Sequence, residues 1–256
     1  MPQPGASAGL NARAMLAEPR QAYIVLGVEP EFDCANPVAA RAALEKADFV
    51  VVMSPFAHGM QYADVLLPVS PFTETAGTFV NCEGRAQSWS GVVKPFRETR
   101  PAWKVLRVMG SMLGLPGFDL ESIEHVRSLL PAVASIPAKL SNATRVAITA
   151  PVTNSSGMER VADVPIHFAD PLVRRARSLQ QTTDAQAPIA QMHALTLAQI
   201  GVTAGAQVKV RQGKGEAVLK TAADPGVPAG VVRIAAAHPS TCGLEGLSGP
   251  ITVERA

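Results

Sequence analysis

The sequence has few charged residues and no strong excess of either sign. Of its 256 residues 17% are charged, and 23 basic residues against 21 acidic ones leave a net charge of +2. It contains no dense tract of Lys and Arg with interleaved aromatic residues, which a nucleic-acid-binding surface would need. We therefore expect no nucleic-acid partner. The hydrophobic content of 47% is that of a globular protein with a sizeable core.

Cysteine and histidine are also sparse and scattered. Cys34, Cys82 and Cys242 lie too far apart in the sequence for a local iron–sulfur or zinc site, and three is a poor number for a disulfide framework. We expect unpaired thiols in a reducing compartment. The histidines form no His-x-x-x-His or Glu-x-x-His pattern that would place two metal ligands on one helical face; they are His58, His125, His167, His193 and His238. The sequence therefore predicts no metal site and no catalytic residue in this chain.

Long apolar runs are missing too. No run approaches the roughly 20 residues that a helix needs to cross a bilayer. The first ten residues have neither the basic start nor the apolar core of a secretory signal. We expect a cytoplasmic protein without direct membrane insertion, which would be peripheral to the inner membrane only through partners.

Short apolar runs that alternate with a helical segment organise the first half of the chain. Asn36-Pro37 predicts a helix start, with Asn as the N-cap and Pro at the first helical position, and the helix continues to about Lys46. Runs rich in Val, Ile and Leu favour strands that are buried on both faces; they are Tyr23–Val28, Phe49–Met53 and Val65–Leu67. This order predicts a parallel, Rossmann-like α/β sheet.

Two further helices are expected before the composition changes. Residues 101–114 place Trp103, Leu106, Met109 and Leu113 at helical spacing, which indicates packing against the sheet. A helix over about 120–130 follows, with Asp119 as its cap. The predicted organisation is therefore a flexible lead-in over 1–18 and an α/β domain over 19–130.

The second half is predicted to be an irregular linker followed by a small barrel. Residues 131–192 are dominated by Ser, Thr, Ala, Pro and Asn with weak periodicity. Within them Arg174, Arg175 and Arg177 could pair with an acidic partner or a phosphate, or form a solvated basic turn. Residues 193–256 contain short strands at close spacing, which favours a small β-barrel; the strands expected are Gln207–Arg211, Ala217–Leu219, Val231–Ala235 and Ile251–Glu254.

One stretch carries a family resemblance. Ala-Asp-Val-Leu-Leu-Pro at 63–68, Thr-Glu-x-x-Gly-Thr-Phe-x-Asn at 73–81 and Glu-Gly-Arg-x-Gln at 83–87 resemble a segment of the molybdopterin oxidoreductases. The flanking runs 11–20 and 26–37 resemble the C-terminal part of the large iron–sulfur subunit of NADH:quinone oxidoreductase, respiratory complex I, a member of that superfamily. The resemblance implies a partial molybdopterin-oxidoreductase domain followed by a double-psi β-barrel-like domain.

The loop over 81–85 is the strongest candidate site. Asn81, Glu83 and Arg85 offer an amide, a carboxylate and a guanidinium, and Arg binds phosphate or carboxylate oxygens in pairs. By resemblance this loop, together with His238, lies near the pterin guanine dinucleotide in relatives that bind molybdenum. The alternative is structural: Glu83 and Arg85 would pair with each other and pin the loop.

The resemblance implies two possible functions, and a third is kept as an alternative without it. The first is a scaffold region of NADH:quinone oxidoreductase that supports electron transfer from NADH to quinone but holds no cluster and catalyses nothing alone. FMN and the iron–sulfur clusters would lie elsewhere in the complex, and the partners would be the other peripheral-arm subunits and an upstream cluster-binding part. The second is the C-terminal part of a molybdenum oxidoreductase similar to formate dehydrogenase, which would bind molybdopterin guanine dinucleotide through Asn81, Glu83, Arg85 and His238. The third is a binding module without redox activity.

Overall fold

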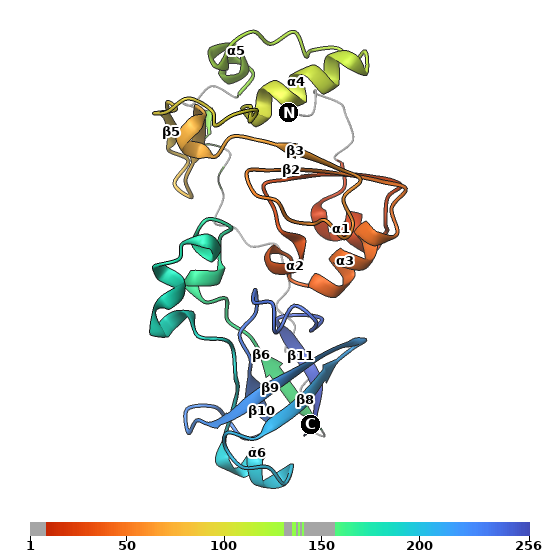
Figure 1. The fold of residues 1–256 in the computed structure, drawn as a ribbon, viewed down its shortest axis with the longest axis vertical. Helices are drawn as coiled ribbons and strands as arrows, with labels where there is room; N and C mark the ends of the chain where they lie inside the picture. Colours follow the sequence, from red (N-terminus) through yellow and green to blue (C-terminus); the bar gives the residue numbers. More distant parts are fainter. Residues whose placement is uncertain (1–8, 131–134, 137, 139, 141–156) are drawn as a thin grey trace. The chain divides into compact units, whose positions relative to one another are not determined.

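The computed structural model describes residues 9–130, 135, 136, 138, 140 and 157–256 (Figure 1). The chain divides into two compact units. Unit 1 comprises residues 1–11, 24–27 and 51–150, and unit 2 comprises 12–23, 28–50 and 151–256, in each case as far as the structure describes them. Parts of the predicted lead-in and linker, residues 1–8 and most of 131–156, lie outside the described residues.

A parallel sheet forms in the first half, as the apolar runs predict. Its strands are β1 (Ala22–Leu26), β2 (Phe49–Ser54) and β3 (Val65–Pro68), in the order β1-β2-β3. β2 and β3 are parallel, with Val51 opposite Val65. Helix α3 (Pro37–Glu45) begins where expected, because the Asn36 side chain accepts a hydrogen bond from the Ala39 amide at 2.9 Å. The predicted α/β class is confirmed.

Helix α4 (Ala102–Met112) packs on the sheet within unit 1 (Figure 1). Its Val105, Leu106 and Met109 contact a buried cluster formed by Val51, Met53 and Val69. The four residues predicted to pack against the sheet are only partly buried, since Leu113 is 70% exposed and Trp103 lines a cavity. The helix ends one residue before Leu113, which explains why that side chain does not share the buried face of α4.

The next helix is shorter than predicted and has a different cap. α5 spans Ile123–Ser128, and the Ser122 hydroxyl accepts a hydrogen bond from the His125 amide at 3.1 Å. Asp119 is therefore not the N-cap. Before α4 the chain forms a short 3₁₀ turn, η1 (Phe72–Glu74), and a hairpin of β4 (Gly77–Val80) and β5 (Ala86–Trp89).

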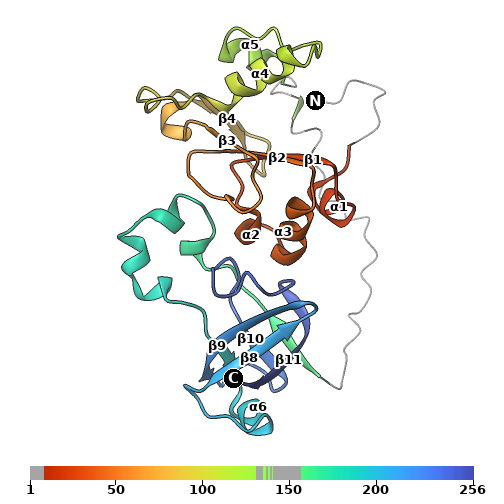
Figure 2. The same cartoon turned by 45° about the vertical axis from the view of Figure 1, so that its right-hand side comes forward.

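Unit 2 contains a closed barrel (Figure 2). Among the described residues six strands close in the order β10-β6-β11-β8-β9-β7. Their bounds are β6 Met158–Val161, β7 Ala190–Met192, β8 Gln207–Gln212, β9 Gly215–Ala223, β10 Val231–Arg233 and β11 Ser248–Arg255. β6 with β10 and β7 with β9 are parallel pairs, and the other pairs are antiparallel. The predicted barrel is confirmed as a closed mixed one.

The remaining helices of unit 2 are short. α1 (Ala12–Ala17) lies within the predicted lead-in, and α2 (Pro30–Asp33) follows β1 directly. α6 (Ala194–Gln199) begins after His193, whose side chain accepts a hydrogen bond from the Leu195 amide. The segment predicted to be an irregular linker supplies two of the barrel strands, β6 and β7, and four 3₁₀ turns between them; these turns are η4 Ile166–Phe168, η5 Val173–Arg175, η6 Leu179–Gln181 and η7 Thr183–Ala185. With four and three residues, β6 and β7 are too short for a periodic pattern to identify.

The barrel interior is mostly apolar, but the polar side chains of Arg160, Gln212 and Thr221 are buried in it. Alternate residues of β8 and β9 are buried, as an inward-facing side of a strand requires. Arg160 on β6 is 2% exposed. Its guanidinium donates to the Gln212 Oε1 atom at 3.1 Å, to the Gly246 carbonyl at 2.6 Å and to the Ile234 carbonyl at 3.2 Å. Burial lowers the pKa of Arg160 to about 10, so the group stays charged at neutral pH.

Candidate functional site

The predicted loop over 81–85 is the turn of the β4–β5 hairpin in unit 1. Its conformation is set by Asn81, whose side-chain oxygen accepts hydrogen bonds from the Glu83 amide at 3.1 Å and the Arg85 amide at 2.9 Å. The Asn81 amide group also donates to the Glu83 carboxylate at 3.4 Å. Gly84 has a φ of 81°, which a residue with a side chain rarely adopts. Asn81 therefore shapes the turn.

Arg85 is left available by this arrangement. Among the described residues no ion pair joins it to Glu83, so the structural alternative of a Glu83–Arg85 pair is wrong and Asn81 holds the loop instead. The Arg85 side chain is exposed, and its guanidinium has no hydrogen-bond or ion-pair partner in the part of the chain that the structure describes. Cys82 beside it is exposed. The loop thus presents a guanidinium that could bind an anion.

The base of the hairpin is firmly fixed. The Phe79 and Trp89 rings stack with centroids 4.5 Å apart, and the Trp89 indole donates to the Phe72 and Thr75 carbonyls at 3.2 and 3.1 Å. Arg127 of α5 donates to the Gly77 and Trp89 carbonyls at 3.3 and 3.2 Å. The turn therefore stands on a rigid base, which favours a defined position for Arg85.

His58 is a second polar group of unit 1 that stands out. It follows β2, and the ends of parallel strands are where α/β proteins place ligands. Both of its ring nitrogens are buried and have no hydrogen-bond partner among the described residues. A buried imidazole without partners costs free energy that a bound polar ligand could recover. Sequence reasoning missed His58, because the burial of its ring depends on the fold and not on its neighbours in the sequence.

His238 belongs to unit 2, in the segment between β10 and β11. Its Nδ1 atom lies 2.8 Å from the Ser240 hydroxyl and accepts a hydrogen bond from the Ser240 amide at 3.1 Å. The ring meets the Phe168 ring edge-on, with centroids 4.8 Å apart. Burial lowers the pKa of His238, so the imidazole is neutral at pH 7. Asn81, Glu83 and Arg85 belong to unit 1, so a single site formed with His238 stays a prediction.

A charged cluster that sequence reasoning did not assemble links α2 to η5 in unit 2. Glu29 is only 1% exposed and forms ion pairs with both Arg174, at 2.9 Å, and Arg175. Arg174 also pairs with Asp33 at 2.7 Å and stacks on the Phe32 ring at 5.2 Å. Arg174 and Arg175 therefore pair with acidic residues of this chain, Glu29 and Asp33, and do not form a solvated basic turn.

Burial dominates the electrostatics of this cluster. It raises the pKa of Asp33, and a backbone hydrogen bond and the neighbouring Arg174 offset only part of that effect. Burial likewise raises the pKa of Cys34 and of Cys242. Both thiols are therefore protonated and poorly nucleophilic at neutral pH. The charged groups hold α2 against η5 and are committed to one another.

Metal sites and membrane spans are not found in the part of the chain that the structure describes. Within residues 9–130 and 157–256 no three His, Cys, Asp or Glu side chains converge as metal ligands. Over the same residues no helix has the length and hydropathy to cross a bilayer.

Comparisons with known proteins give a family context for both halves. Residues 4–111 match the family "Molybdopterin oxidoreductase", and residues 172–250 match the family "Molydopterin dinucleotide binding domain". A Staphylococcus aureus (strain USA300) protein named as a candidate formate dehydrogenase is 37% identical over 103 residues, which cover 38% of this chain and 10% of that protein. A Bacillus subtilis (strain 168) protein named as an oxidoreductase is 34% identical over 120 residues, or 45% of this chain and 12% of that protein.

A solved structure supports the fold. Acetylene hydratase from Pelobacter acetylenicus is similar with a TM-score of 0.61 and 17% identity, over 95% of this chain and 46% of that one. The chain therefore spans less than half of that structure and about a tenth of the two relatives it matches.

Proposed function

We propose that this chain, which belongs to the molybdopterin oxidoreductase superfamily, forms the dinucleotide-binding part of a molybdenum oxidoreductase similar to formate dehydrogenases. The observation that carries this proposal is the match of residues 172–250 to the dinucleotide-binding domain, a range that includes the barrel strands β7 to β10 and the start of β11. The relatives favour this function over a NADH:quinone oxidoreductase subunit, because the Staphylococcus protein is named as a formate dehydrogenase.

The residues present fit such a cofactor. Arg85 has free planar donors suited to phosphate oxygens, and His58 has two buried nitrogens without partners among the described residues. His238 offers a neutral imidazole on the barrel. When bound, molybdopterin guanine dinucleotide would supply the redox chemistry. The contribution of unit 1 would be to bind and orient it: Arg85 at the phosphates and His58 as a hydrogen-bonding group, with Asn81 holding the loop in shape.

A second function is favoured by a different observation. Asn81 and Glu83 are satisfied within their own turn, and Glu29, Arg174 and Arg175 are paired internally. Polar groups used in this way suit a scaffold without cofactor, as the resemblance to NADH:quinone oxidoreductase implies. In that case the partners would be the other subunits of the peripheral arm.

Cofactor content separates the two functions. The full chain is produced in a bacterial host that makes the guanine dinucleotide cofactor, and oxidised pterin fluorescence and elemental analysis for molybdenum, tungsten and iron are measured. Binding of GDP, the nucleotide half of the cofactor, is measured as well, because a cofactor lost in purification would still leave that site. Bound pterin or saturable GDP binding supports the proposal, and the absence of both overturns it in favour of the scaffold.

A matched pair of variants locates the site. Arg85→Gln should weaken GDP binding about tenfold, since a charged hydrogen-bonded contact contributes about 1.5 kcal/mol or more. Arg13→Gln removes another exposed arginine and should leave binding unchanged. Equal binding by the two variants would remove Arg85 from the site.

A further inference from the structure

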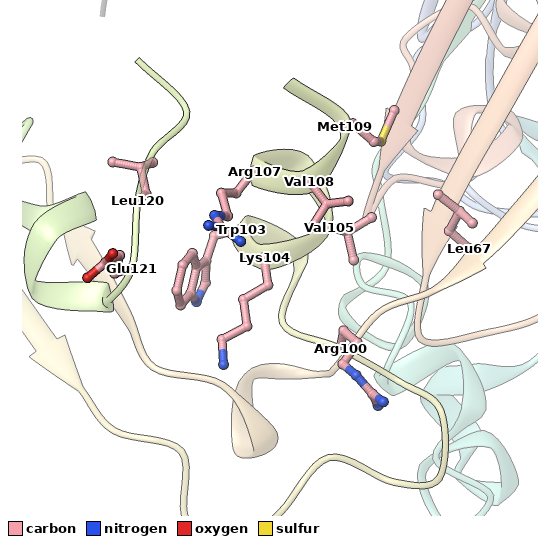
Figure 3. Close-up of a pocket in the computed structure, with 10 residues that line it drawn as sticks. All are labelled: Leu67, Arg100, Trp103, Lys104, Val105, Arg107, Val108, Met109, Leu120 and Glu121. Atoms are coloured by element: carbon pink, nitrogen blue, oxygen red, sulfur yellow. The ribbon is translucent and has the colours of Figure 1, made fainter. Parts of the chain in front are cut away.

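Two hollows lie beside α4 in unit 1, and Figure 3 shows the residues that line the larger one. One cavity of about 700 Å³ is lined by residues of α4, by Leu67 of β3 and by the segment that carries Leu120 and Glu121. Trp103 and Lys104 project into this space from the helix (Figure 3). A second hollow of about 660 Å³ shares lining residues with it; the shared residues are Arg100, Trp103, Lys104 and Glu121. The two hollows therefore adjoin, and we call them together the α4 trough.

Positive charge predominates in the α4 trough. Its cations are Lys94, Arg100, Lys104 and Arg107. In the part of the chain that the structure describes, none of the four forms an ion pair, and the buried Nε atom of Arg107 has no hydrogen-bond partner. The Arg100 guanidinium donates to the Thr99 carbonyl at 2.8 Å, which leaves its charge unneutralised. Four cations without an ion pair among the described residues, in a chain of net charge +2, form a local field that attracts anions.

The acidic residues of the trough do not neutralise this field. The Glu74 carboxylate accepts hydrogen bonds from the Phe96 amide at 2.9 Å and the Thr99 hydroxyl at 3.3 Å, so it serves its own loop. Glu121 is exposed and has no ion pair among the described residues. One free carboxylate therefore faces four cations.

Apolar side chains complete the wall. Leu67, Val105 and Met109 line the larger cavity, and Val93 at the other hollow is 58% exposed. The Lys104 ammonium lies 5.4 Å from the centroid of the Trp103 ring, so this aromatic face is already polarised by a cation. Aromatic and Arg side chains beside an apolar pocket are the residue types that anchor protein interfaces.

We propose that the α4 trough docks an extended acidic segment of a partner protein, with its carboxylates on the four cations and an aliphatic side chain in the cavity beside Trp103. Charge complementarity argues for an acidic occupant. The size of the two adjoining hollows argues for a chain segment, since together they exceed what one small anion would fill. The trough contains none of the residues assigned to the cofactor.

Fluorescence anisotropy with a labelled peptide tests the proposal on the full chain. The probe alternates Glu and Leu over about ten residues, which span roughly 33 Å when extended, and the control peptide replaces each Glu by Gln. The acidic peptide should bind about tenfold more tightly than the neutral one, because each carboxylate gains a modest surface pairing. Its affinity should fall at high salt, where the Debye length shortens to about 3 Å at 1 M.

Charge reversal identifies the surface. Lys94→Glu combined with Lys104→Glu changes two exposed lysines, so folding should be preserved, and it should weaken the acidic peptide about tenfold. Lys220→Glu on β9 reverses an exposed lysine elsewhere and should have no effect. Equal binding of the acidic and neutral peptides, or wild-type binding by the double variant, would overturn the proposal.

Two further readouts exclude other occupants. If the chain self-associates and the double variant abolishes that association, the trough receives a second copy and the proposal is wrong. GDP should not compete with the acidic peptide, because the cofactor is assigned to other residues. A failure of GDP binding would therefore leave the docking proposal intact, and a failure of peptide binding would leave the cofactor proposal intact.

Discussion

Replacing Arg160 by Met should destabilise the protein by about 2–4 kcal/mol. The substitution keeps an unbranched side chain of similar reach inside the barrel but removes every donor. The Gln212 side-chain oxygen and the carbonyls of Gly246 and Ile234 then lose their partner. Each buried acceptor left unsatisfied costs about 1–3 kcal/mol.

An opposing effect reduces this sum. Burial lowers the pKa of Arg160 to about 10, which shows that the charged guanidinium is itself penalised in the barrel, and the Met variant no longer carries that penalty. The three orphaned acceptors should outweigh it, because no water or other donor replaces the guanidinium in a well-packed interior. The expected net loss is therefore smaller than the full sum of three unsatisfied groups.

Urea unfolding followed by circular dichroism measures the effect. The midpoint should fall while the slope m stays constant, which indicates a change in stability alone. Arg233→Met on the neighbouring strand β10 is the control, since its ion pair with Asp163 is exposed and should contribute no more than about 1 kcal/mol. A variant Arg160→Met as stable as the wild type would refute the reasoning, and would place this arginine among buried charges that apolar residues can replace without loss.

Three further outcomes follow from buried groups. Glu29→Gln should lower the unfolding free energy by about 2–4 kcal/mol, because two arginines lose their buried charged partner; the exposed Glu18→Gln should change it by less than about 1 kcal/mol, and equal effects would contradict the role of burial. His238 has a lowered pKa, so its contribution is present above the unfolded value of about 6.5 and is lost as pH falls toward the folded value. His238→Gln should therefore reduce the loss of melting temperature between pH 7.5 and pH 5, and an unchanged pH dependence would count against this. At pH 7.5 iodoacetamide should label exposed Cys82 first by mass spectrometry, and fast labelling would be unexpected at the two thiols whose pKa is raised, Cys34 and Cys242.

Elements with strong local signals could be predicted from the sequence. Asn36-Pro37 marks a helix start by side-chain chemistry alone, and the Val-rich run at Phe49 is long enough to identify a buried strand. The hairpin Gln207–Ala223 was recognisable because its alternation and Gly turn lie within a short stretch. In each case the information that fixes the element is contained in the element itself.

Features that depend on distant residues could not be predicted. Arg175 pairs with Glu29 across 146 positions, and nothing near either residue indicates the other. Strands β6 and β7 form because their barrel neighbours supply the hydrogen bonds. Their own residues do not indicate whether the segment is a strand or a loop. At the candidate site, the sequence identified the loop but not that Asn81 closes it, since that role requires the turn geometry.

The position of β6 has a consequence for how the chain folds. β6 pairs with β10 in parallel and with β11 antiparallel, so it joins partners that are made some 70 to 90 residues later, as the register Val231 with Glu159 and Ile251 with Met158 shows. The β8–β9 hairpin needs only local loop closure, whereas closing the barrel requires contacts of high sequence separation, which form slowly. During synthesis the barrel therefore cannot close before β11 is made. Until then β6 and β8 are open edges, which a chaperone could protect.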